Sequence, residues 1–277
     1  MHDLRPPAEA LADRDATRAL AESLGLEFAE ASISVADSAQ ANAESAAREL
    51  RYDALCSMAK RRGIRWIATG HHADDQAETL LMRLIRGSGP GGLVGVHPSR
   101  AIGDQTVIRP MLGITRADSE RLCAQAGVSG CRDASNEDQS LLRVAIRARV
   151  GPVLEELAPG ASTRIAQAAQ LQNELLAVLD EATDRLIEQA GAKPSDLDAP
   201  RGITLQRGPL ADARPVVLGR LLQRLTSDVG RDRSGKRVLD AITDAIGDDN
   251  PAPRDFTLGG AQIRVLGHTV EISPTTR

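Results

Sequence analysis

Hydrophobic and polar positions follow two different periods along the first half of the chain. Apolar residues spaced by three and four predict amphipathic helices, and the short apolar runs between them predict buried strands. The helical pattern covers residues 12–24, 42–62, 76–86 and 116–126, and the extended pattern covers residues 26–35 and 64–69. Such alternation with short connections is typical of a parallel sheet with helices on both faces. We therefore predict an α/β fold with a doubly wound parallel sheet.

The pattern changes after Pro159 and Gly160, which interrupt the helical periodicity. A long helix is predicted directly afterwards, and a loop marked by Pro194, Pro200 and Gly202 follows it. The rest is predicted to be a small α+β unit, with helices over 211–225 and 235–246 and strands near 256–258, 263–266 and 269–272. We expect two domains: residues 1–158, and residues 159–277 with a linker helix and a smaller α+β C-terminal domain.

Composition narrows the class of protein. Apolar content is 42%, charged content is 26%, and the aromatic residues are only two Phe, one Tyr and one Trp. The core must therefore consist of Leu, Ile, Val and Ala, and nucleic-acid binding by base stacking is disfavoured. The net charge is −4, yet a local surplus of basic residues lies between Arg201 and Arg237. That surplus suits either a phosphate-facing surface or a solvated helix face.

Cysteine usage and hydropathy favour a cytoplasmic protein. The three cysteines, Cys56, Cys123 and Cys131, form no Cys-x-x-Cys pair, which favours a reducing compartment and no structural metal. Neither a signal peptide nor a run of 18 apolar residues is present, so no contact with a membrane is expected. The sequence indicates no oligomeric state.

A dense group of titratable side chains directly follows the predicted strand 64–69. His71, His72, Asp74, Asp75 and Glu78 fall within eight positions, just where the strand gives way to a helix. Ligands of α/β proteins bind at the carboxyl ends of strands, so this junction is the candidate site. If the helix starts near Asp75, the Asp75 and Glu78 side chains share one face of its first turn.

Two other interpretations of this group stay open on the residues alone. Asp75 is a good helix N-cap, and Glu78 three residues later completes a pattern close to a capping box. This interpretation leaves His71, His72 and Asp74 unexplained. His and Asp clusters of this density also suit zinc or manganese in a hydrolase, but no second His or Cys cluster supplies further ligands.

Three stretches, taken in order, resemble one family. Residues 67–96 resemble the signature of the tRNA(Ile)-lysidine synthetases, members of the PP-loop ATP pyrophosphatase superfamily. Residues 42–52 resemble the family's helix pattern Asn-x-Glu-x-x-Ala-Arg-x-x-Arg-Tyr. Residues 109–112, 133–138 and 143–147 resemble its Arg-Pro-Leu-Leu, Asp-x-Ser-Asn and Arg-Asn-x-Ile-Arg elements, with Val144 standing where many members have Asn. The resemblance implies an adenine nucleotide alpha hydrolase-like fold for residues 1–158.

The resemblance also implies an activity. Family members use ATP and Mg²⁺ to adenylate the C2 oxygen of the wobble cytidine in tRNA(Ile) with a CAU anticodon, and L-lysine then displaces AMP to form lysidine. In these terms His71, Asp75 and Glu78 are catalytic, with the carboxylates holding the cationic lysine and His71 shuttling protons. The residues expected to bind lysine, ATP or tRNA are Arg51, His72, Asp74, Arg143 and Arg147.

One departure from the family pattern is large. The Ser-Gly-Gly-x-Asp-Ser phosphate loop of the superfamily occurs nowhere in the sequence, and Met1–Arg5 resembles the end of the family's second strand. The glycines between Gly87 and Gly92 read as a helix C-cap and turn instead of a phosphate loop. Two hypotheses follow: an N-terminally shortened form of the ligase, or a non-catalytic tRNA-binding or degenerate protein. With its first strand missing, the sheet would have unpaired edges, so we expect poor expression and no thermal shift with ATP.

Overall fold

The computed structural model describes residues 7–33, 43–128, 141–192, 202–225 and 233–274, in two compact units. The first unit is Met1–Glu78 with Val96–Ala166, and the second is Thr79–Gly95 with Gln167–Arg277. Several features expected from the sequence lie outside the described residues. These are the strand end at residues 1–5, Asn42, Cys131, the motif at 133–138 and the basic residues Arg201 and Arg231.

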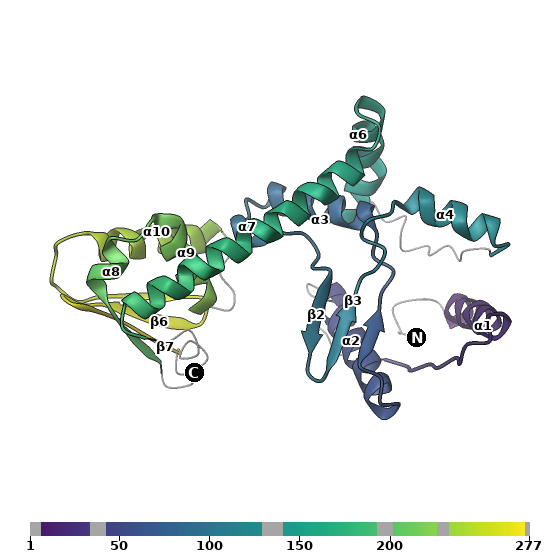
Figure 1. Cartoon of the computed structure of the whole chain (residues 1–277), viewed down its shortest axis with the longest axis horizontal. Coiled ribbons are helices and arrows are strands. Elements are labelled where there is room, and N and C mark those ends of the chain that lie inside the picture. The colour runs from purple at the N-terminus through teal and green to yellow at the C-terminus, as the bar shows by residue number, and fades with distance from the viewer. Residues whose placement is uncertain (1–6, 34–42, 129–140, 193–201, 226–232, 275–277) are drawn as a thin grey trace. The chain divides into compact units, whose positions relative to one another are not determined.

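The first unit combines helices with short strands (Figure 1), but the strand expected over residues 26–35 is not found in the described residues 26–33, which hold only a single bridge at Ile33. Helices α2 and α4 end at or before glycines with positive φ, Gly63 and Gly127, which is how an α-helix commonly terminates. Thr115 caps α4 in a complete capping box with Asp118. Its elements are α1 (Pro7–Ser23), α2 (Ala43–Arg61), β1 (Trp66–Ala68), the start of α3 (Ala73–Ile85), β2 (Ser99–Ile102), β3 (Gln105–Ile108), α4 (Arg116–Gln125), α5 (Leu142–Ala145), a π-helical turn (Ile146–Val150) and α6 (Gly151–Leu157).

The described sheet of this unit is mixed, which corrects the expectation of an all-parallel sheet. Its strand order is β1-β3-β2; β1 pairs parallel with β3, and β2 pairs antiparallel with β3. The antiparallel pair is a hairpin with Gly103 in the left-handed region (φ 56°), a conformation that suits a tight turn. Ile67 and Val107 pair across the parallel ladder and pack on Ala59 of α2. The α/β class is confirmed, while the described strands include only one parallel pair.

The second unit is an α+β domain with its own core. Its sheet has the order β4-β7-β6-β5 and is antiparallel throughout. Leu205, Leu221, Ile242 and Ile263 are fully buried in the core between the sheet and the helices. Its elements, besides the end of α3 and most of α7 (Ala161–Gln189), are β4 (Ile203–Gln206), α8 (Arg207–Ala211), α9 (Pro215–Leu225), α10 (Arg233–Gly247), β5 (Arg254–Leu258), β6 (Ala261–Val265) and β7 (Thr269–Pro274).

A buried arginine organises one end of this domain. Arg207 is 6% exposed, and its guanidinium donates to the carbonyl oxygens of Ile246 (3.0 Å), Ala245 (3.0 Å), Asn250 (3.0 Å) and Leu266 (3.2 Å). It also donates to the backbone and side chain of Asp248. These partners include the last carbonyls of α10, which have no acceptor role within the helix itself. The guanidinium therefore serves as the C-terminal cap of α10.

No helix in the described part of the chain is long and apolar enough to cross a membrane.

Candidate functional site

The turn between β1 and α3 is pinned to its neighbours by backbone hydrogen bonds. The amide of Thr69 donates to Ile108 O at 3.0 Å, and the amide of Ala73 donates to Ile114 O at 2.8 Å. The Thr69 hydroxyl and His71 Nδ1 are hydrogen bonded at 2.9 Å, which fixes the orientation of the imidazole ring. The turn thus places His71 just beyond the carboxyl end of a strand, as the sequence pattern predicts.

A cavity of about 430 Å³ opens beside this turn. Three residues predicted from the sequence, Arg51, His71 and Asp75, line it together. Glu78 does not line it; its carboxylate accepts hydrogen bonds from Arg143 and Arg147. The other lining residues are Arg48, Tyr52, Leu55, Thr69 and Gly70.

Asp75 and Glu78 form an ion-pair cluster with Arg143 and Arg147, and Asp75 is the member that lines the cavity. Arg143 donates from Nη2 to Asp75 Oδ1 (2.6 Å) and from Nε to Glu78 Oε2 (2.8 Å), so it bridges both acids. Arg147 donates to both carboxylate oxygens of Glu78, from Nε to Oε1 at 2.6 Å and from Nη2 to Oε2 at 3.0 Å. The Glu78 side chain is 6% exposed, and every contact in the cluster lies within the first unit. Glu78 therefore orients Arg143 and Arg147, and Asp75 is the carboxylate that reaches the cavity.

The capping interpretation is right in part. The helix starts at Ala73, and the backbone amide of His72 donates to Asp75 Oδ2 at 3.0 Å, so Asp75 caps α3 from its third residue. Glu78 has no part in this cap, because both of its oxygens accept from arginines. Asp74 caps a different helix, accepting from the amide of Arg116 at 2.7 Å. Helix capping thus explains the position of Asp74 and the hydrogen bond of Asp75 Oδ2. The other oxygen, Asp75 Oδ1, accepts from Arg143.

His72 lies between two acids. Its Nδ1 is 3.3 Å from Asp74 Oδ2 and its Nε2 is 3.5 Å from Asp75 Oδ2, yet Nδ1 is buried with no hydrogen-bond partner. His72 Nδ1 thus lies near the Asp74 carboxylate without the alignment that a hydrogen bond requires.

Charge and burial set the protonation states at the cavity. Burial lowers the pKa of His71 below its usual 6.5; Asp75 opposes the shift, and Arg109, Arg48 and Arg143 add to it. The imidazole is therefore neutral at pH 7 and able to accept a proton. Burial alone would raise the pKa of Asp75, but the His72 amide and the positive charge of Arg143 outweigh it and hold that pKa below its usual range. The cavity thus presents a neutral base beside an ionised carboxylate.

Sequence reasoning missed Arg48 and Tyr52, which line the cavity, and Arg109, which is hydrogen bonded to Tyr52. Tyr52 Oη accepts from Arg48 Nη2 at 3.5 Å and from Arg109 Nη2 at 3.3 Å, while Arg109 Nη1 donates to His97 O at 2.7 Å. Arg109 is 6% exposed, and its Nε has no hydrogen-bond partner among described residues. Arg48, Tyr52 and Arg109 all lie in strings that resemble the family, which was the available signal.

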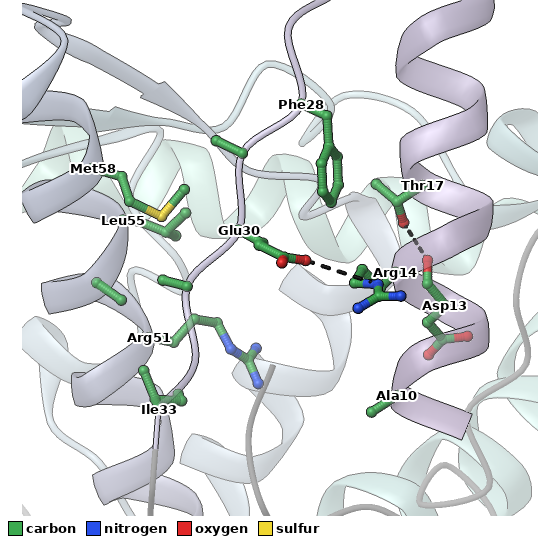
Figure 2. A pocket seen from close by; sticks show the side chains of 13 residues that line it. Ala10, Asp13, Arg14, Thr17, Phe28, Glu30, Ile33, Arg51, Leu55 and Met58 are labelled. Carbon is green, nitrogen blue, oxygen red and sulfur yellow. Dashed lines mark hydrogen bonds and ion pairs between the residues drawn. The ribbon is translucent and has the colours of Figure 1, made fainter. Parts of the chain in front are cut away.

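A second cavity of about 320 Å³ lies between α1, residues 28–33 and α2 (Figure 2). Arg51 lines this cavity as well as the first, so its guanidinium lies where the two sets of lining residues meet. Phe28 and Met58 supply apolar lining, and the ion pair of Arg14 Nε with Glu30 Oε2 (3.9 Å) crosses it.

The metal-site interpretation gains no support from the geometry. Among the residues that the structure describes, no three His, Cys, Asp or Glu side chains converge to hold a metal ion. The nearby acids instead accept from arginines and backbone amides.

Comparison with known proteins agrees with the α/β class of the fold. The sequence profile of the PP-loop domain matches residues 1–154, which are most of the first unit together with residues 79–95 of the second. The chain is 37% identical to a tRNA(Ile)-lysidine synthase of Salinispora arenicola over 188 residues, which is 68% of this chain and 54% of that relative. It is 32% identical to a tRNA(Ile)-lysidine synthase of Methylobacterium nodulans over 281 residues, 99% of this chain and 80% of the relative.

A third relative, the tRNA(Ile)-lysidine synthase of Dehalococcoides mccartyi, is 34% identical over 259 residues, 89% of this chain. The chain spans about half the length of the Salinispora and Dehalococcoides relatives, 54% and 53%. These matches extend beyond the PP-loop domain into the second unit. The chain belongs to the tRNA(Ile)-lysidine synthase family.

Proposed function

We propose that this chain contributes to lysidine formation, the ATP-dependent attachment of L-lysine to C2 of the wobble cytidine of CAU-anticodon tRNA(Ile) in the cytoplasm. In the first step the C2 oxygen attacks the α-phosphate of ATP, and pyrophosphate leaves. In the second step the lysine ε-amine attacks C2, and AMP leaves with the former C2 oxygen. The observation that carries this proposal is the neutral His71 beside the ionised Asp75 in one cavity.

The pair suits the delivery of an amine. An alkylammonium is not a nucleophile, so it must lose a proton before it attacks the activated carbon. Asp75 binds the ammonium by a charge-assisted hydrogen bond, and His71 takes the proton released during attack. When Nδ1 donates to the Thr69 hydroxyl, Nε2 is the free acceptor.

The arginines divide into two groups in this proposal. Arg48 and Arg51 line the cavity, where their charge suits the carboxylate of lysine or the phosphates of ATP. Arg143 and Arg147 are positioning residues, because their guanidinium groups are engaged by Asp75 and Glu78. His72 and Asp74 hold the turn and the start of α4. The described residues contain no group of three His, Cys, Asp or Glu side chains that could hold a magnesium ion.

The test measures incorporation of radiolabelled lysine into a tRNA(Ile) transcript in the presence of ATP, with a transcript whose wobble cytidine is uridine as the control. Asp75→Asn removes the charge but keeps the shape. Losing one charge-assisted hydrogen bond costs about 1.5–3 kcal/mol, so the lysine KM should rise about 10-fold to 150-fold while the ATP KM stays constant. Asp104→Asn, on the exposed β2–β3 turn, is the matched control.

The non-catalytic alternative gives a different result in the same experiment. A tRNA-binding protein would retain the transcript in a filter assay without incorporating lysine, and Asp75→Asn would leave retention unchanged. Equal rises in the lysine and ATP constants would remove Asp75 from the lysine site. Absence of both incorporation and calorimetrically measured lysine binding would overturn the proposal as a whole.

A further inference from the structure

One cavity is lined entirely by residues of the second unit. It has a volume of about 740 Å³ and is enclosed by the end of α3, the glycine-rich turn that follows it, α7, α9 and α10. We call it the α9–α10 groove. Its lining residues all belong to the second unit, whereas His71 and Asp75 line a cavity of the first unit.

The walls of the groove are fixed by contacts already present. Arg83 donates from Nη1 to Gly92 O (2.6 Å) and Gly95 O (2.7 Å), which ties the glycine-rich turn to α3. Asn173 of α7 donates to Val94 O at 3.0 Å. On the other wall, Arg220 of α9 makes a two-point ion pair with Asp180 of α7, at 2.6 and 3.0 Å. A preformed groove loses little entropy when a ligand binds.

The glycine-rich turn lies close to side chains of α9. A Cβ added at Gly91 would lie 3.0 Å from Arg220 Nη1, and one at Gly89 would lie 3.6 Å from Gln223 Nε2. A side chain at position 91 would therefore crowd the Arg220 guanidinium, whereas one at position 89 would make only an ordinary contact.

Positive charge in the groove is not neutralised by the described protein. Arg86, Lys236 and Arg237 line it, and none of the three makes an ion pair with a described residue. Arg86 also lowers the pKa of the partly buried Arg83, after the larger effect of burial. Asp240 is the acidic side chain among the lining residues. The groove therefore favours a ligand with several negative charges.

Aliphatic side chains accompany these cations. Leu84, Ile85 and Val216 line the groove and are 53%, 64% and 51% exposed, which is unusual for large aliphatic residues gathered in one place. Leu179 and Leu239 add further apolar lining. A ligand that covered only the cations would leave this apolar surface in water.

We propose that the α9–α10 groove binds an acidic amphipathic helix from a protein partner. The apolar face of such a helix covers Leu84, Ile85 and Val216, and its carboxylates meet Arg86, Lys236 and Arg237. Charge complementarity selects an acidic partner and speeds its encounter with the groove, while apolar burial slows its release. An RNA backbone matches the cations but leaves the aliphatic residues uncovered, and no described lining residue is aromatic for base stacking.

The experiment uses the full chain and a fluorescein-labelled peptide of about 18 residues, long enough for five helical turns. The peptide carries Leu at positions i, i+3, i+4 and i+7, with Glu at most other positions. Three further probes are a scrambled peptide of equal composition, poly-glutamate and a tRNA transcript. We expect the anisotropy to show saturable binding of the amphipathic peptide, at least about tenfold tighter than the scrambled peptide and poly-glutamate.

Variants locate the binding. Lys236→Glu with Arg237→Glu, and separately Val216→Asp, should each weaken peptide binding at least about tenfold, because one removes the charge match and the other the apolar contact. Arg185→Glu on α7 also reverses an exposed positive charge, but it lies outside the groove lining and should leave binding unchanged. Far-ultraviolet circular dichroism checks that each variant is folded.

The proposal fails if the scrambled peptide binds as tightly as the amphipathic one, since that would show charge attraction without a shaped groove. It also fails if the groove variants bind the peptide normally. If the peptide does not bind and the tRNA transcript does, with binding lost in the Lys236→Glu and Arg237→Glu variant alone, the groove is an RNA surface. Amide protection of residues 84–90, 215–223 and 236–240 by the peptide would support the proposal directly.

Discussion

Replacing Glu78 with glutamine tests whether the ion-pair cluster holds the first unit together. The substitution preserves the side-chain shape but removes the charge that accepts from Arg143 and from both donors of Arg147. Breaking a buried ion pair typically costs about 3–5 kcal/mol. Arg143 and Arg147 are 28% and 25% exposed and Arg143 keeps Asp75, so water and the remaining acid offset part of the loss. We expect a destabilisation of about 2–3 kcal/mol.

The assay follows urea unfolding by tryptophan fluorescence. Trp66 is the only tryptophan in the sequence and lies in β1, so its signal reports on the first unit alone. The midpoint should fall while the slope of free energy against urea stays constant. Glu120→Gln, which removes an exposed carboxylate 3.6 Å from Arg116, should cost no more than about 0.5 kcal/mol.

A double-mutant cycle separates the pair from its surroundings. Arg147→Gln alone and combined with Glu78→Gln should show a coupling energy of about 1–3 kcal/mol. If Glu78→Gln destabilises the first unit no more than Glu120→Gln does, Glu78 is not the buried centre of the cluster and the reasoning is refuted.

Three further predictions concern a glycine, an aspartate and a histidine. Gly202→Ala should lower the free energy of unfolding of the second unit by about 1–3 kcal/mol, because Gly202 has φ +84° and a Cβ there would lie 2.6 Å from Ile272 O. Urea unfolding followed by circular dichroism measures the change. Gly208→Ala is the control and should not destabilise the unit, because a Cβ at that position meets no atom within 4 Å. The ion pair with Arg254 lowers the pKa of Asp248 from 3.8 to about 2. The stability that this ion pair contributes is therefore present above about pH 4 and is lost as the pH falls toward 2. Asp248→Asn should remove this pH dependence, and Asp249→Asn should leave it unchanged. In an NMR titration the His71 pKa should lie below 6.5 and fall further in Asp75→Asn, because Asp75 is the group that raises it; a rise would contradict this electrostatic account.

The helices were predictable from the sequence because their signals are local. Residues 42–62 and 116–126 gave helices α2 and α4 to within about a residue at each end, since periodicity and terminal glycines mark both limits. The β2–β3 hairpin and β4 were missed. Strand β2 is almost entirely exposed and shows no alternation, whereas β4 alternates buried and exposed residues but is only four residues long.

The site was predictable only as a local group. Strand, turn and helix placed His71 and Asp75 correctly from neighbouring residues. The use of Glu78 as a partner of Arg143 and Arg147 depends on contacts across 65 and 69 positions of sequence. The same holds for Tyr52 and Arg109, which are 57 positions apart. Such pairs follow from tertiary packing, which neither spacing nor composition reveals.

The Arg207 guanidinium donates hydrogen bonds to three segments of the chain at once. Its acceptors lie at the end of α10, in the turn that contains Asn250, and at Leu266 after β6. If any one of these segments unfolded locally, the buried Arg207 guanidinium would lose hydrogen bonds. Because water reaches it poorly, its unpaired N–H groups would raise the free energy of the partly open state. Local opening at the end of α10 is therefore suppressed, and amide hydrogen exchange at these three places should require the domain to open as one cooperative unit.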